Sequence, residues 1–328
     1  MPDSLPAMPR SRLQALLDAM PTVRIGVVGD LMLDRYLEGD VERISPEAPV
    51  PVIAIASERE SAGGAANVAA NLVALGAAVT LVGVHGDDAA GKSLLGCIAA
   101  LGIDPGHLIQ VPGRPTTTKT RIIARGQQVT RLDHEVTTDL QPEHAEAVRR
   151  GVESMIDSID VLLVADYDKG VCHPALARHL IDTARAAGVP VVVDPKQRQF
   201  FDYAGATVIK PNRRELETAL ARAVSGEPRQ LEAARQRTGA QHLLLTLGAD
   251  GMILVSPDAA PRALPSIARE VFDVSGAGDT VTAWLGAALA AGANMQEAAW
   301  LANLAAGVSV GKRGAAVVTG KEVVGHRS

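Results

Sequence analysis

The sequence of 328 residues predicts one α/β domain, spanning 1–328, in which a mostly parallel β-sheet is covered by helices. Short apolar runs of strand length alternate with Ala-rich runs of helical periodicity, which is typical of parallel sheets. Apolar residues make up 47% of the chain, enough for a large core. Polar residues also stand where several of the expected strands end. Ligands bind at this edge of a parallel sheet, so these residues are candidate site residues. Asp and Asn also serve as turn and cap residues, which explains the same positions. These strand ends are Asp30, Asp166, Asp194, Asn212 and Thr246.

In chain order, residues 1–20 predict a loosely attached helix, and the sheet begins with the apolar run Val23–Gly29. The later expected strands are 79–84, 161–165, 189–193, 207–209 and 243–247. The helices expected between them are Ala65–Leu75, Lys92–Leu101, Pro174–Ala187 and Pro228–Thr238. A further run of helical spacing, Val281–Ala293, follows a glycine-rich turn.

Two regions interrupt the alternation and predict a small β-layer. Pro49–Ala56 has the alternating pattern of a strand, and residues 116–124 with 127–133 have the pattern of a hairpin that turns near Gly126. We interpret segments 34–56 and 116–135 as a β-lid that projects from the sheet and covers a site. A hairpin that only decorates the edge of the sheet explains the same pattern.

Bulk composition argues against several classes of function. A net charge of −5 without a dense basic block is atypical of proteins that bind nucleic acid or an anionic membrane. Cys97 and Cys172 are too few for a disulfide framework or a zinc cluster. The longest apolar run is too short to span a bilayer, and residues 1–20 lack the apolar segment of a secretion signal. We therefore expect a cytoplasmic protein.

The stretch Phe272–Thr280 carries the most informative functional pattern. Gly276 and Gly278 stand where a helix begins, so an anion can reach backbone N–H groups that have no partner in the first turn, next to the positive end of the helix dipole. Asp279 would repel a bound phosphate unless it is a base that takes a proton from a hydroxyl during phosphoryl transfer. A capped helix with a flexible turn accounts for these residues equally well.

A second glycine-rich stretch, Gly86–Ser93, fits the G-x-x-x-x-G-K-[ST] pattern of a P-loop. It follows an expected strand and opens an expected helix, and Val161–Asp166 resembles the acidic strand that would hold magnesium. Asp87 and Asp88, however, place two carboxylates in the loop that would have to cradle phosphates. We favour a turn rich in capping residues, with Lys92 in solvent.

Residues near the first strand suggest a site for a polyhydroxylated ligand. Gly63 and Gly64 allow close approach to the backbone and Asn67 could bond sugar hydroxyls, although a tight strand-to-helix turn also explains the glycines. Asp34 is suited to bind vicinal hydroxyls and Arg35 to bind a phosphate, unless both are ordinary surface charges. Further cations that would contribute if they face inward are Arg43, Lys119, Arg121 and Lys169.

The stretch from Lys210 to Glu215 ends a strand and starts a helix, which places Asn212 and Glu215 on one helix face. Glu215 could hold hydrated magnesium, and an Asn cap with a capping-box Glu fits the same spacing. The glycine turn Thr246–Gly251 could meet a nucleotide phosphate or ribose, or could be only a turn between strands.

Four motifs therefore follow one another along the chain. They are Gly63-Gly64-x-x-Asn67, Asn212-x-x-Glu215, Thr246-x-Gly248-x-x-Gly251 and Asp273-x-x-Gly276-Ala277-Gly278-Asp279-Thr280. Together they resemble the ribokinase-like (PfkB) family of sugar kinases over nearly the whole chain; the last motif is highly specific and the others support it. The resemblance implies a ribokinase-like fold, Asp279 as catalytic base and residues 276–278 as an anion hole. It also implies that Asn212 and Glu215 lie near the phosphates of Mg·ATP, with Glu215 reaching the metal through water, and that Asn303 lies near the nucleotide base.

Three further stretches narrow this resemblance. Gly29–Tyr36, Arg43–Val52 and Asp166–Gly170 are similar to the members that phosphorylate a heptose 7-phosphate at its anomeric O1. The substrate-binding residues implied are Asp34, Gly63, Gly64 and Asn67, with Arg35 and Lys169 as phosphate partners. In some relatives a nucleotidyltransferase domain follows, and a chain that ends at Ser328 is expected to lack that activity.

The resemblance further implies ATP and Mg²⁺ as cofactors, K⁺ as a candidate activator, and a homodimer paired through the β-lids. Three alternatives stay open: an ATP-dependent kinase of another sugar or sugar phosphate, a P-loop NTPase built on Lys92, and a non-catalytic regulator that binds sugar or nucleotide. The intact Asp279 argues against the regulator, and ATP turnover that depends on added sugar would exclude it.

Overall fold

The structure is a computed structural model that describes residues 3–198, 200–268 and 270–327. Within these residues the main sheet has ten strands in the order β1-β14-β13-β12-β11-β10-β9-β2-β5-β6. The strands are β1 Asp3–Ser4, β2 Arg24–Gly29, β5 Ala78–Gly86, β6 Leu108–Val111, β9 Val161–Ala165, β10 Val191–Asp194, β11 Val208–Ile209, β12 His242–Thr246, β13 Met252–Val255 and β14 Arg262–Leu264. All neighbouring strands are parallel except for the two pairs that β13 makes, with β12 and β14. The predicted mostly parallel sheet is confirmed.

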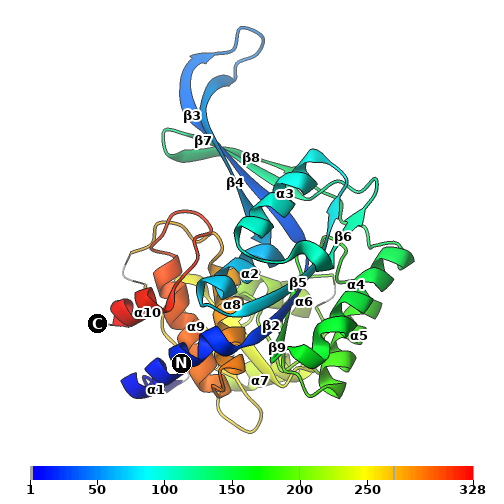
Figure 1. Cartoon of the computed structure of the whole chain (residues 1–328). Coiled ribbons are helices and arrows are strands. Elements are labelled where there is room, and N and C mark those ends of the chain that lie inside the picture. The colour runs from blue at the N-terminus through cyan, green and yellow to red at the C-terminus, as the bar shows by residue number, and fades with distance from the viewer. Residues whose placement is uncertain (1–2, 199, 269, 328) are drawn as a thin grey trace.

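Helices cover both faces of this sheet (Figure 1). They are α1 Arg10–Ala19, α2 Ala65–Ala74, α3 Ala89–Ala100, α4 Pro142–Met155, α5 Pro174–Ala186, α6 Arg213–Leu220, α7 Pro228–Thr238, α8 Ala277–Ala290, α9 Met295–Ser309 and α10 Gly320–Arg327. Val161 and Leu163 of β9 join the core that includes α2, α8 and α9, whereas Leu162 and Val164 join the core that includes α4 and α5. Because each central strand is buried on both faces, it reads as a continuous apolar run. Among the described residues, no helix has the length and apolar character needed to cross a membrane.

The second sheet forms the predicted β-lid. In the described part of the chain it has four strands in the order β4-β3-β7-β8, namely β3 Leu31–Ile44, β4 Pro51–Gly64, β7 Thr118–Ala124 and β8 Gln127–His134. β3 follows directly on β2, and the long β3–β4 hairpin projects well beyond the body of the molecule (Figure 1). The β7–β8 hairpin turns at Arg125 and Gly126, both with positive φ, as predicted.

Two lid segments differ from the sequence prediction. Residues 34–44 had been placed in the lid without a strand of their own, but residues 31–44 form β3, which pairs with β4 on one side and β7 on the other. β4 in turn runs on to Gly64, past the expected end at Ala56. Gly63 and Gly64 are thus the last residues of this strand, and α2 begins at Ala65, where the helix was expected.

The N-terminal helix is also different from the expectation, because α1 is firmly attached. Leu13 and Leu16 are buried in the main core. Arg12 donates to the carboxylate of Glu297 in α9 at 2.8 Å. An apolar face and one ion pair therefore hold this helix against the body of the protein.

Candidate active site

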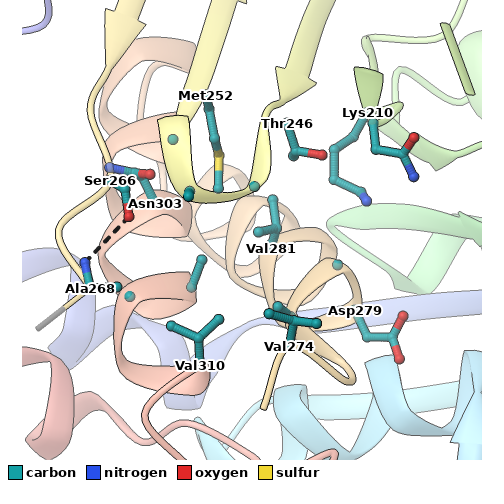
Figure 2. Close-up of a pocket in the computed structure, with 18 of the residues that line it drawn as sticks. Lys210, Thr246, Met252, Ser266, Ala268, Val274, Asp279, Val281, Asn303 and Val310 are labelled. Atoms are coloured by element: carbon teal, nitrogen blue, oxygen red, sulfur yellow. Dashed lines mark hydrogen bonds between the residues drawn. The ribbon is translucent and has the colours of Figure 1, made fainter. Parts of the chain in front are cut away.

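The base predicted from the sequence, Asp279, lies in the first turn of α8 (Figure 2). The chain enters this helix through Gly276, whose φ of 76° lies in the left-handed region that favours glycine. A Cβ on Gly276 would lie 3.0 Å from the Cβ of Ala315, so a larger residue would not fit without movement. The N–H of Ala277 donates to Val274 at 3.3 Å, whereas among the described residues no backbone acceptor is found for the N–H of Gly278. The start of α8 can therefore receive an anion next to the carboxylate.

Two side chains from distant parts of the chain hold the carboxylate of Asp279. Asn67 of α2 donates to one oxygen at 2.6 Å, and the hydroxyl of Tyr167 donates to the other at 2.5 Å. Burial raises the pKa of Asp279 to about 6, although both hydrogen bonds act to lower it. Burial also raises the pKa of Tyr167, so its hydroxyl stays protonated and serves as a donor. Asp279 thus has the geometry and the pKa of a general base that is ionised at neutral pH.

The loop that carries Tyr167 is held in place by a buried carboxylate. Asp30, at the end of β2, accepts hydrogen bonds from the backbone N–H groups of Tyr167, Lys169 and Val171 at 2.8 to 3.1 Å. Asp166 accepts a bond from the hydroxyl of Tyr203, and its pKa is raised to about 7 by burial and by Asp30. These two strand-end aspartates therefore shape the loop. Lys169 of this loop was predicted from the sequence as a site residue, whereas Tyr167 was not.

A cavity of about 380 Å³ opens next to Asp279 on the side of β12 and β13. The nucleotide-binding residues expected from the sequence all line it, namely Asn212, Glu215, Thr246, Gly248, Gly251 and Asn303. Apolar side chains form its other walls, including Met252, Val274, Val281 and Val310 (Figure 2). The cavity therefore combines an apolar end, suited to a planar base, with a polar end beside Asp279.

Two glycines of the β12–β13 turn affect this cavity in different ways. At Gly251, with φ of 87°, a Cβ would overlap backbone atoms of Leu264 and Ser266, so the turn requires glycine. At Gly248, with φ of 61°, nothing lies within 4 Å of the position of a Cβ, so the missing side chain leaves open space. Asn303 donates to the carbonyl of Pro265 at 2.9 Å, which fixes its amide in the cavity wall.

Lysines and carboxylates meet at the polar end of the cavity. Lys210 lies 3.0 Å from Asp194, and a Cβ on Gly278 would lie 3.6 Å from its Nζ, so this cation stands beside the anion-binding turn. Lys196 pairs with Glu215; burial would lower the pKa of Lys196, but Asp194 and Glu215 together raise it. Neither Lys196 nor Lys210 was predicted from the sequence as a site residue, and Lys210 was expected only at the end of a strand.

The carboxylate oxygens of this cluster are suited to a metal ion that is bound through water molecules. Asn212 and Glu215 form the expected capping box, so both oxygens of Glu215 are engaged, one by the Asn212 N–H and one by Lys196. One oxygen of Asp194 is buried without a hydrogen-bond partner among the described residues. Those residues include no group of three or more His, Cys, Asp and Glu placed to hold a metal ion. The donors therefore fit a hydrated Mg²⁺ bound chiefly by nucleotide phosphates.

On the opposite side of Asp279, the lid presents a face to the body of the protein. Asp34 of β3 lies on this face, paired with Arg121 of β7 at 2.5 Å. Gly63 leaves room for that carboxylate, because a Cβ there would overlap it. Arg35, the next residue, points to the other face of the strand and pairs with Glu60 at 2.6 Å. The structure thus brings Asp34 to the site and does not bring Arg35 there.

Lys169 belongs to the loop after β9 that also carries Tyr167, and its side chain reaches Glu135 at the end of the lid. Its Nζ is 2.8 Å from the carboxylate of Glu135, which is also 3.4 Å from Lys119 of β7. The carboxylate of Glu135 therefore already balances part of the charge of Lys169. Gly64, with φ of 61°, makes the sharp entry into α2 that places Asn67 against Asp279.

The P-loop-like stretch is capped by a carboxylate of the protein itself. Asp88 caps α3 and accepts from the N–H of Gly91 at 2.8 Å and from the backbone and hydroxyl of Thr116 at 2.9 and 2.7 Å. Lys92 is exposed on the first turn of α3. A phosphate would meet the carboxylate of Asp88 in this loop, so the capped turn is the interpretation that the structure supports.

Comparison with known proteins gives a family and close relatives. The description "pfkB family carbohydrate kinase" matches residues 24–320. A bifunctional protein HldE of Pelobacter propionicus is 43% identical over 320 residues, covering 97% of this chain and 66% of that protein. The protein of the same name from Paramagnetospirillum magneticum is 46% identical over 321 residues, covering 96% and 66%. The chain thus spans 66% of the length of these two relatives.

Solved structures show the same fold at lower identity. Arabidopsis thaliana ribokinase, complexed with ribose and ATP, aligns with a TM-score of 0.71 at 21% identity, covering 93% of this chain and 98% of that one. Escherichia coli phosphofructokinase-2, in complex with potassium, aligns with a TM-score of 0.73 at 18% identity, covering 92% and 97%. The ribokinase-like fold expected from the sequence is confirmed.

Proposed function

This chain belongs to the pfkB family of carbohydrate kinases and is a sugar kinase, and from that premise we propose that it phosphorylates D-glycero-β-D-manno-heptose 7-phosphate at O1. The donor would be ATP and the product heptose 1,7-bisphosphate, for ADP-heptose and lipopolysaccharide core biosynthesis. The observation that carries the proposal is the position of Asp279. It stands between a cavity of nucleotide size and a lid face that presents Asp34 and several cations.

In this proposal the reacting groups meet at the start of α8. The sugar hydroxyl donates to Asp279, which takes its proton as the bond to phosphorus forms. The N–H of Gly278 and the ammonium of Lys210 face the phosphoryl group and stabilise its charge. Asn67 and Tyr167 keep the carboxylate oriented towards the hydroxyl.

ATP would lie in the cavity lined by Asn303, Thr246 and the β12–β13 turn, with its phosphates towards Lys210. Mg²⁺ would neutralise charge on the phosphates, and its water ligands would meet Asp194 and Glu215. Potassium stays a candidate activator in this proposal.

The heptose assignment rests on the three stretches that resemble heptose 7-phosphate kinases. Two of them, Gly29–Tyr36 and Asp166–Gly170, supply Asp34 and the Tyr167 loop on the sugar side of Asp279. The third, Arg43–Val52, forms the exposed tip of the β3–β4 hairpin, which projects away from α8, the helix that carries Asp279 (Figure 1). Asp34, Gly63, Gly64 and Asn67 are proposed to hold the sugar. A cytoplasmic location and a homodimer joined through the lids complete the proposal.

A panel of acceptors tests this function. Initial rates with ATP and Mg²⁺ should give the highest kcat/KM for heptose 7-phosphate, compared with the free heptose, ribose and fructose 6-phosphate. Equal or better turnover of ribose would refute the heptose assignment and leave the sugar kinase intact. ATP binding without turnover of any sugar in the panel would instead favour a regulator.

A further inference from the structure

We infer that Arg59 of β4 binds a phosphate group on the substrate, at the end of the sugar opposite the hydroxyl that Asp279 deprotonates. The inference rests on the proposed function, because it concerns the acceptor site of the same reaction. Arg59 lies on the lid and was not among the site residues predicted from the sequence.

Arg59 is held in place by an aromatic ring and not by a carboxylate. Its guanidinium carbon lies 4.0 Å from the centre of the Tyr36 ring, and Arg121 lies over the same ring at 5.2 Å. Tyr36 is only 5% exposed, so it is a firm support for both cations. A guanidinium stacked in this way keeps its N–H groups free for a planar, bidentate partner.

The pairing of charges on this lid face leaves Arg59 without a carboxylate. Arg121 is neutralised by Asp34, and Arg131 lies 2.7 Å from Asp133. For Arg59 no carboxylate lies within ion-pair distance among the described residues. Phosphate oxygens are the acceptors that best match an unpaired guanidinium, whereas sugar hydroxyls are better matched by the carboxylate of Asp34.

Arg59 also lies beside the loop after α9, which connects it to the start of α8. A Cβ on Gly314 would lie 3.7 Å from Nη2 of Arg59. The neighbouring Ala315 lies close to Gly276 at the start of α8, because a Cβ on Gly276 would be 3.0 Å from the Cβ of Ala315 and 3.1 Å from Nδ2 of Asn67. Since Asn67 bonds Asp279, one continuous wall leads from the base to Arg59. A sugar lying along this wall would have its reacting hydroxyl at Asp279 and its far end at Arg59.

The wall also stays open where the phosphate would lie. Gly314, with φ of 67°, carries no side chain towards Arg59. The nearby carboxylate of Asp273 points into the loop instead, accepting from the N–H groups of Ser275 and Gly314 at 2.8 and 3.0 Å. Its charge is thus held by backbone donors, and no carboxylate of this loop pairs with Arg59 among the described residues.

The substitution Arg59→Gln tests the inference by comparing a sugar with and without its phosphate. For heptose 7-phosphate, kcat/KM should fall by roughly 10- to 100-fold, mainly through KM, as expected for losing a hydrogen-bonded charged pair. For the free heptose, kcat/KM should be unchanged, and KM for ATP should stay the same in both assays. Arg59→Lys keeps the charge without the planar fork and should lie between wild type and Arg59→Gln. Arg229→Gln, the same change on an exposed residue of α7, is the control.

The other outcomes separate this inference from the proposed function. An equal fall for the phosphorylated and the free sugar, or no fall for either, would overturn the role of Arg59. If the wild type prefers another sugar phosphate to the heptose, the heptose assignment fails, and the same comparison is made with that sugar and its free form. A wild type that prefers an unphosphorylated sugar would overturn both proposals.

Discussion

At the scale of single residues, the chemistry depends on how Asp279 is kept both basic and ionised. Burial raises the pKa of its carboxyl, while the hydrogen bonds from Asn67 and Tyr167 oppose this rise, and the result is a value of about 6. Such a carboxylate is mostly ionised at pH 7 and is still a stronger base than an ordinary aspartate. Each oxygen of the carboxylate keeps a lone pair for a substrate hydroxyl, because each accepts one bond.

Removing this base should be far more damaging than removing the lysine of the P-loop-like stretch. In Asp279→Asn, kcat should fall by ~10²- to 10⁴-fold, the usual worth of a positioned acid–base group. ATP binding should survive or tighten slightly, because a negative charge near the phosphates is gone. Lys92→Ala should leave turnover close to wild type, because Lys92 is exposed. Steady-state kinetics, with circular dichroism to confirm folding, measure both; a folded Lys92→Ala protein without activity would move the active site to the other loop.

The pH profile should report the hydrogen bond from Tyr167. In the wild type, log kcat/KM should fall as the pH drops below about 6, because the base becomes protonated. Tyr167→Phe removes a donor to the ionised form, so the pKa of Asp279 rises and this acid limb moves to higher pH. Asp194→Asn removes a nearby negative charge that raises the pKa of Asp279, so the limb should move to lower pH. Identical profiles for Tyr167→Phe and wild type would contradict a role of Tyr167 in tuning the base.

The origin of these contacts explains which site residues the sequence could predict. Asp279 and Gly276 belong to one short motif whose glycines and helix start lie together in the chain. The partners of Asp279 are 212 and 112 residues away, so only the folded sheet brings them together. Asn67 was predicted through its own motif, and Tyr167, a single aromatic residue in a loop, gave no comparable signal. Arg35 and Asp34 are neighbours in the sequence and were expected at the same site. The alternation of side chains along β3 places them on opposite faces of the strand.

At the scale of elements, features that depend on residues close together in the sequence could be predicted. The pairing of segments far apart in the sequence could not. The capping box of Asn212 and Glu215 depends on residues three apart, so it could be read directly and is present in the structure. β3 could not be read in this way, because its charged residues find partners on β4 and β7 that lie 25 and 87 residues away. The same limit applies to Gly63, because the sequence alone could not show that this glycine also makes room for the carboxylate of Asp34.

The buried carboxylate of Asp30, at the end of β2, fixes the conformation of the loop after β9. Asp30 is completely buried, and burial raises the pKa of its carboxyl, but three backbone N–H groups of the 167–171 segment compensate for much of this cost. The bonds fix the backbone on both sides of Lys169 and so place the Tyr167 hydroxyl at Asp279. An aspartate at a strand end can therefore help to position the proposed base without touching it.

At the scale of the whole molecule, the C-terminal ends of the parallel strands organise both halves of the site. β10, β11 and β12 end at the nucleotide-side cavity, with Asp194, Asn212 and Thr246 in its wall. β2 and β9 end on the side proposed to bind the sugar, where Asp30 fixes the loop of Tyr167. Asp279 lies at the boundary between the two sides, so a kinase with this arrangement can bind its two substrates from separate directions and join them at one base.

The projecting lid leads to a prediction about assembly. Its large apolar side chains are strongly exposed in the single chain: Ile44 at 62%, Val50 at 51%, Ile55 at 48%, Val129 at 48% and Leu132 at 56%. Apolar groups gathered on a sheet of four strands favour association with a second sheet, and pairing of lids would cover them. Sedimentation of the wild type at micromolar concentration should therefore give a dimer. The double variant Ile55→Asp with Leu132→Asp should shift the equilibrium towards the monomer. Ala223→Asp, which adds a charge of the same sign to an exposed residue outside the lid, should leave the dimer intact. A wild-type monomer with an unchanged KM for the sugar would show that the lid works within one chain, and its apolar residues would then need another explanation.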